Sequence, residues 1–156
     1  MKRFVAAVIV MLCTVGAARA ESPPVGTALV LLIDVSGSID NTEYDLQKNG
    51  IAAAFRDPAV VRAIWNQPYG RMAVAVVEWS DTATVVLPWT TLEDEASSRR
   101  FADLVHRIER TSRGSTALGT AVTFAVELFE TCHCAAARRA TRAAARSGSR
   151  RGMPHT

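Results

Sequence analysis

The sequence has 156 residues and a formal net charge of +3, with 49% hydrophobic and 21% charged residues. This length fits one domain with or without terminal extensions, and the composition excludes a wholly disordered or collagen-like chain. The charge is uneven: residues 1–20 carry three basic residues, residues 138–151 carry six Arg, and the part between them carries nine basic and all fifteen acidic residues. The central part is therefore acidic, and a nucleic-acid partner, which the overall basic charge would suggest, is not expected.

The amino-terminal segment, residues 1–20, has the three parts of a secretory signal peptide. A positive start, Met-Lys-Arg, precedes an apolar stretch over residues 4–18, and residues 18–20 read Ala-Arg-Ala, the small-x-small pattern of a cleavage site. The stretch is shorter than the roughly 20 residues that a membrane-spanning helix needs. Leu12 stands where a lipid-attachment site at Cys13 would have a small residue. We therefore expect export, to the periplasm or outside the cell, with no membrane span in the mature chain.

Two cysteines, Cys132 and Cys134, remain after removal of the signal peptide. In an oxidising compartment this Cys-x-Cys pair is expected to form a disulfide, either between the two cysteines or with another chain. A zinc site is the weaker interpretation, because His133 and the distant His106 and His155 are the histidines that could complete it. Structural zinc normally takes four ligands in a recognisable spacing.

The central part of the sequence alternates between strand and helix patterns. In chain order, the predicted elements are a strand at 28–33, a helix at 41–56, a short turn from Pro58, a break at 68–70, strands at 72–79 and 83–89, a helix at 94–110, a loop at 111–116 and a helix at 118–131. The first strand is apolar on both faces, which is typical of a central parallel strand covered by helices on each side. The link between the second and third strands is too short for a crossover helix, so that pair is expected to be antiparallel. Together these elements predict an α/β sheet.

Residues 34–38, Asp-Val-Ser-Gly-Ser, follow the first strand directly. In open α/β sheets, ligands bind at the carboxyl ends of the strands. Asp34, Ser36 and Ser38 place one carboxylate and two hydroxyls at alternate positions of a tight turn, and Mg²⁺ prefers such hard oxygen donors. Three donors are few for this ion, so Gly-Ser-Thr at residues 114–116 is the candidate for a second ligand loop. In the structural alternative, Asp34 caps the turn and the serines bond main-chain groups.

These motifs resemble those of the von Willebrand factor type A domain. Residues 31–39 resemble its first metal loop, residues 114–118 resemble its threonine loop before a helix, and residues 76–81 resemble its middle strand and turn. The resemblance covers about residues 27–131, and the short exported form is similar to a bacterial group of uncharacterised function. It implies a Rossmann-like, mostly parallel sheet with helices on both faces.

The resemblance also implies a metal-ion-dependent adhesion site. Ser36, Ser38 and Thr116 would give hydroxyl oxygens to Mg²⁺ or Mn²⁺, and Asp34 would bind directly or through water. One coordination position would remain for a carboxylate of a partner protein, so the metal would be part of the interface. No catalysis is expected. An aspartyl-phosphate phosphatase, which is a metal-dependent hydrolase, has the pattern Asp-x-Asp, whereas this chain has Ser36 in the place of the second Asp. A serine hydrolase needs Gly-x-Ser-x-Gly, which residues 34–38 do not have.

The sequence departs from the family pattern after residue 131. The family has another buried strand there, with a third metal loop, but residues 135–156 contain seven Ala and six Arg and no Val, Ile, Leu, Phe, Trp or Tyr. We therefore expect residues 132–156 to be a disordered tail. Residues 21–131 would form a type A domain truncated after about three strands, with an unpaired edge on the first strand.

The origin of the arginine-rich tail has two interpretations. In the first, the tail is a basic arm that binds phosphate or acidic surfaces. In the second, it is an out-of-frame translation of a GC-rich gene, and this chain is then a truncated, non-functional product. The abrupt change of composition just after residues 132–134 favours the second interpretation.

Overall fold

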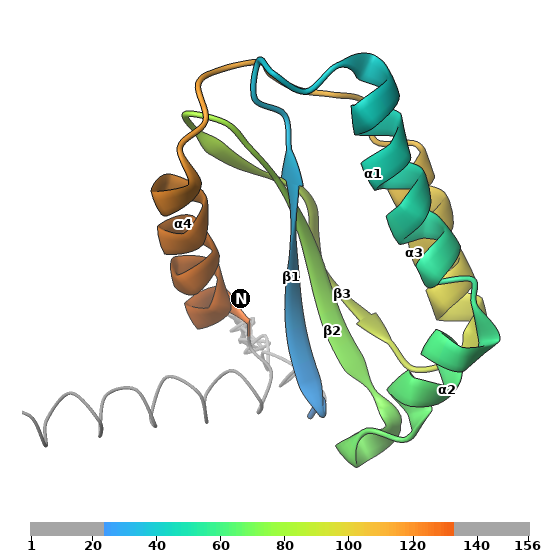
Figure 1. Cartoon of the computed structure of the whole chain (residues 1–156). Helices are drawn as coiled ribbons and strands as arrows, with labels where there is room; N and C mark the ends of the chain where they lie inside the picture. Colours follow the sequence, from blue (N-terminus) through green and yellow to red (C-terminus); the bar gives the residue numbers. More distant parts are fainter. Residues whose placement is uncertain (1–23, 133–156) are drawn as a thin grey trace, which may run out of the picture.

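The computed structural model describes residues 24–132, so the predicted signal peptide and nearly all of the predicted tail lie outside the described residues. In chain order, the elements are β1 (Thr27–Asp34), α1 (Asn41–Ala54), α2 (Pro58–Trp65), the short 3₁₀ turn η1 (Pro68–Gly70), β2 (Met72–Trp79), β3 (Ala83–Leu92), α3 (Glu95–His106) and α4 (Leu118–Thr131). The predicted α/β fold with helices on both faces of a sheet is confirmed (Figure 1). No helix within residues 24–132 is both long and apolar enough to cross a membrane.

The sheet has the strand order β1-β2-β3. β1 runs parallel to β2 in a register that places Thr27 opposite Met72 and Asp34 opposite Trp79. β2 and β3 are antiparallel, as the short link between them predicts. β1 lies at the edge of the described sheet and not at its centre, so residues 27–32 are half-buried, whereas residues 73–79 of β2 are buried. The unpaired edge expected for the first strand is therefore present within the described residues.

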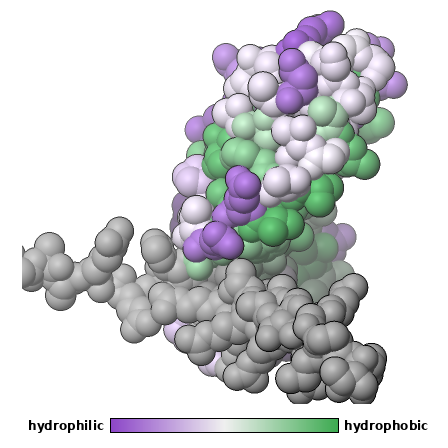
Figure 2. All heavy atoms as spheres, turned by 90° about the vertical axis from the view of Figure 1, so that its left-hand side faces the viewer, coloured by the Kyte–Doolittle hydropathy of each residue, from purple (hydrophilic) through white to green (hydrophobic). Residues whose placement is uncertain are grey.

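The two faces of the sheet are covered unequally. α1, α2 and α3 lie on one face and α4 lies alone on the other (Figure 1). The main core fills the first side, where the rings of Phe55 and Phe101 meet edge-to-face with centroids 4.7 Å apart. The α4 side holds a smaller cluster that includes Ala73 and Cys132, and Figure 2 shows hydrophobic surface exposed on this side.

The segment from Pro58 to Trp65 is an eight-residue helix, α2, where the sequence predicted only a short turn. The side chain of Asp57 caps this helix by accepting a hydrogen bond from the main-chain N–H of Ala59 at 2.6 Å. Proline is favoured at the first position of a helix because its missing N–H would have no partner there. Pro58 therefore begins a helix, and α2 buries Val61 and Ile64.

Two other elements end at different residues from those predicted. β3 continues past Trp89 to Leu92, which pairs with Met72 and is buried. α3 ends at His106, four residues before the predicted end, and Ile108 packs into the core from the following segment. This early end lets Arg110 leave the helix and reach the loop after β1.

Candidate functional site

Three loops meet at the carboxyl ends of β1 and β2. The segment after β1 carries residues 34–38, and residues 107–117 pass from α3 to α4 across the same edge (Figure 1). Gly37 N–H donates to the carbonyl of Gly114 at 2.7 Å, and Ser36 forms an isolated parallel bridge with Gly114. The turn after β2 joins them, because Ala117 N–H donates to the carbonyl of Ser80 at 3.1 Å. The two loops that the sequence singles out are therefore neighbours.

The predicted ligands lie on two of these loops. Ser36 N–H donates to Asp34 Oδ1 at 2.8 Å, and the hydroxyl oxygens of Ser36 and Ser38 are 3.3 Å apart. Ser36 is fully buried, whereas Ser38 is exposed. Thr116 is exposed on the neighbouring loop, two residues after Gly114. The structure thus brings together Asp34, Ser36 and Ser38, while within residues 24–132 no hydrogen bond joins Thr116 to them.

The paired hydroxyls fit the requirements of a magnesium-type ion. Two oxygen ligands at right angles, each 2.0–2.1 Å from Mg²⁺, lie about 2.9 Å apart, which is close to the 3.3 Å between the hydroxyl oxygens of Ser36 and Ser38. The exposed side of the turn is open to solvent at Gly37 and Ser38. Among the described residues, no group of three or more His, Cys, Asp and Glu side chains could hold a metal. A metal at this turn would depend on hydroxyl oxygens.

The structural alternative, a turn that binds no metal, accounts for the contacts of Asp34 but not for those of the serine side chains. Asp34 caps the turn, because its carboxylate accepts the N–H of Ser36. The serine hydroxyls contact each other, where that alternative predicted hydrogen bonds to main-chain groups.

Gly114 allows the loops to approach each other closely. A Cβ atom at this position would lie 2.0 Å from Oδ1 of Asp81 and 2.8 Å from Oγ of Ser80. Ser80 is fully buried, and its hydroxyl donates to Asp81 at 3.0 Å. A side chain at this position would displace the exposed carboxylate of Asp81, so glycine favours the close approach without being required for it. The Gly-Ser-Thr motif therefore has a packing role that its sequence spacing did not indicate.

A buried carboxylate, missed by the sequence analysis, lies on the α1 side of β2. Glu78 is 1% exposed and accepts hydrogen bonds from the Tyr44 hydroxyl at 2.6 Å, from the Thr111 N–H at 2.9 Å and from the Thr111 hydroxyl. Burial, together with the hydrogen bond to Glu78, raises the pKa of Tyr44 above its usual range. The signal in the sequence was a single acidic residue within an otherwise apolar strand.

Two further side chains hold the main chain of the predicted metal loop. Gln47 of α1 accepts the N–H of Asp34 at 3.1 Å and donates to the carbonyl of Asp34 at 3.2 Å. Arg110 donates to the carbonyls of Val35 at 2.8 Å, Ser36 at 3.0 Å and Ile39 at 2.9 Å. These contacts span more than ten residues in the sequence for Gln47 and about seventy for Arg110, so no local pattern indicates them.

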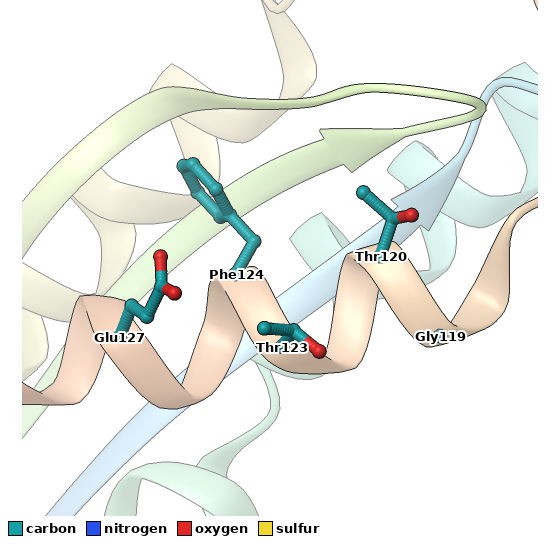
Figure 3. A pocket seen from close by; sticks show the side chains of 5 residues that line it. All are labelled: Gly119, Thr120, Thr123, Phe124 and Glu127. Atoms are coloured by element: carbon teal, nitrogen blue, oxygen red, sulfur yellow. The ribbon is translucent and has the colours of Figure 1, made fainter.

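Other candidate groups lie away from the predicted metal site. A hollow of about 440 Å³ runs along α4 and is lined by Gly119, Thr120, Thr123, Phe124 and Glu127. In Figure 3, Thr120, Phe124 and Glu127 point to one side of the helix. His106 is exposed at the end of α3, with its Nδ1 atom 2.9 Å from Oδ1 of Asn49.

Cys132, at the end of α4, is buried and disulfide-bonded. Cys134 and Cys13 lie outside the described residues, as do two of the histidines, His133 and His155, that a zinc site would need. The sequence-based expectation of a disulfide at Cys132 agrees with the structure.

Fold and site together define an α/β domain with an Asp-x-Ser-x-Ser turn at the carboxyl edge of its sheet. The chain belongs to the family described as protein of unknown function (DUF1194), which it matches over residues 24–155. None of the proteins with curated descriptions matches the chain.

Solved structures that resemble this chain include the following two. Both are of proximal thread matrix protein 1 from the mussel byssus. One, described as having a zinc-occupied MIDAS motif, is 19% identical, with a TM-score of 0.46 over 65% of this chain and 24% of that chain. The other, a second crystal form, is 20% identical, with a TM-score of 0.44 over 64% of this chain and 24% of that chain. This chain thus spans about a quarter of the length of these neighbours.

Proposed function

We propose that this chain is an exported, non-catalytic protein-binding domain of the von Willebrand factor A type. It would hold Mg²⁺ or Mn²⁺ through Asp34, Ser36, Ser38 and Thr116 and engage a carboxylate of a partner protein. The observation that carries the proposal is the 3.3 Å pair of serine hydroxyls beside the Asp34 carboxylate.

Each ligand has a distinct part in this proposal. The metal would supply a positive centre with a position open to an incoming carboxylate. Buried Ser36 provides a fixed oxygen at the base of the turn, and exposed Ser38 lies on the side from which a partner would approach. Asp34 supplies negative charge against the metal, and Thr116 would complete the site from the second loop.

Thermal unfolding of residues 21–156 with Mg²⁺, Mn²⁺ or EDTA tests the proposal. A ligand that binds only the folded chain raises the melting temperature, so we expect a higher value with metal than with EDTA. Asp34→Ala and Thr116→Ala should abolish this rise, whereas Thr120→Ala, on the exposed side of α4, should keep it.

Two results would overturn the proposal. One is a wild-type chain that melts cooperatively at the same temperature with metal and with EDTA. The other is turnover of phosphate or ester substrates that depends on Asp34, since this would indicate a metal-dependent hydrolase and not a binding domain.

A further inference from the structure

Arg110 lies against the main chain of residues 35–39, in the predicted metal loop. Its Nη2 atom donates to the carbonyls of Val35 and Ser36, and its Nη1 atom donates to the carbonyl of Ile39 at 2.9 Å. Its Nε atom donates to the carbonyl of Ser112 at 3.1 Å. One guanidinium group therefore binds main-chain atoms of both loops that carry the predicted ligands.

The position of Arg110 is itself fixed by the buried network around Glu78. Thr111, the next residue, donates to Glu78 through both its N–H and its hydroxyl. The Tyr44 ring lies against the guanidinium group, with its centroid 5.6 Å from Cζ, and its hydroxyl donates to Glu78. Because Glu78 is on β2 and is 1% exposed, this network connects the metal loop to the buried central strand of the described sheet.

The geometry suits arginine and no other residue. Arginine presents five N–H donors in a rigid planar fork, whereas lysine has three rotatable donors on a compact charge. The Nε, Nη1 and Nη2 atoms of Arg110 together donate to four main-chain carbonyls, which is an arrangement that this fork of donors fits. A lysine at this position would keep the charge and lose most of these hydrogen bonds.

We propose that Arg110 is a positioning residue, which holds residues 35–39 in their ligand-bearing shape before any metal binds. The consequence for metal affinity rests on the proposed function, but the ordering of the loop does not. The opposite, purely electrostatic expectation is that a positive charge beside a bound cation weakens metal binding. Removal of the Arg110 charge should therefore weaken metal binding if Arg110 positions the loop, and strengthen it if the effect of Arg110 is electrostatic.

Amide hydrogen exchange in EDTA tests the ordering of the loop directly. The N–H groups of Val35, Ser36, Gly37 and Ile39 are all hydrogen-bonded and serve as probes. In Arg110→Lys they should exchange about tenfold faster or more, which is the effect of losing one or two net hydrogen bonds. The amides of residues 74–77 in β2 report global stability, so they should exchange faster by no more than the same factor.

The matched control is Arg113→Lys, on the same loop. Within residues 24–132, the one hydrogen bond of the Arg113 side chain is to the side chain of Asn41 at the start of α1, at 2.6 Å, so its replacement should leave the loop amides unchanged. Equal exchange of the loop amides in Arg110→Lys and the wild type would overturn the inference, and so would a larger increase in β2 than in the loop.

Calorimetric titration with Mn²⁺ provides the second readout. Arg110→Lys and Arg110→Met should both weaken binding about tenfold, with Arg113→Lys unchanged. Tighter binding by Arg110→Met would show an electrostatic role and overturn the inference. If the wild type binds no Mn²⁺ while the loop amides still lose protection in Arg110→Lys, the proposed function fails and the positioning role stands.

Discussion

The two faces of the sheet are built differently. On one face, three helices cover a core in which Ile33, Val76 and Phe101 are fully buried. On the other face, α4 lies alone, and the cluster there is smaller, with Val25, Ala73 and Cys132 as its buried residues.

The candidate site lies where the chain passes between these two faces. Its fixed parts, Glu78, Tyr44 and Arg110, belong to the well-covered face. Thr116 lies two residues before α4, which covers the other face. The side chains that hold the main chain of the site therefore come from the well-covered face.

The largest effect is expected in the core beside α3. Phe101→Ala removes a fully buried ring that contacts Phe55, and such a cavity typically costs about 3–5 kcal/mol of unfolding free energy. Urea denaturation would measure it. Leu104→Ala, at a 44% exposed position of the same helix, is the control and should have a much smaller effect. Similar losses at both positions would mean that this face is less tightly packed than described.

A smaller effect is expected in the network that connects this face to the site. Tyr44→Phe removes a donor from the buried Glu78 carboxylate, which should cost about 1–3 kcal/mol. The pKa of Tyr44 is raised by burial, so its stabilising effect is complete below the ordinary value of 10.0 and falls as the pH rises above it. Urea denaturation between pH 8 and pH 11 should show this alkaline loss in the wild type and less of it in Tyr44→Phe. Tyr69→Phe, at an exposed position, should behave as the wild type.

The sequence predicted the elements whose patterns are local. The apolar runs at residues 28–33 and 72–79 identified two strands, and the short link after Trp79 identified the antiparallel pair. The candidate loops were predicted to lie together because residues 34–38 offer few metal ligands and residues 114–116 offer further hydroxyls. In each of these cases a pattern of a few consecutive residues was sufficient.

What the sequence did not predict depends on contacts between distant residues. Pro58 is the exception, because its helix depends on the neighbouring residue Asp57, whose side chain caps it. The role of Arg110 depends on carbonyls 71 to 75 residues away. The edge position of β1 depends on which strands pair with it, which its own composition does not encode.

The smallest effect on stability is expected on the exposed side of α4. Leu118, Val122 and Val126 recur at every fourth position and are 50–59% exposed, so they form an apolar stripe on one side of the helix. Val122→Ser with Val126→Ser should change the unfolding free energy by no more than about 0.5 kcal/mol per site. Because exposed apolar stripes favour association, the double variant should show less self-association in sedimentation velocity than the wild type. A large loss of stability would show instead that these valines are needed for packing, and the contrast between the two faces would then be smaller than their exposure indicates.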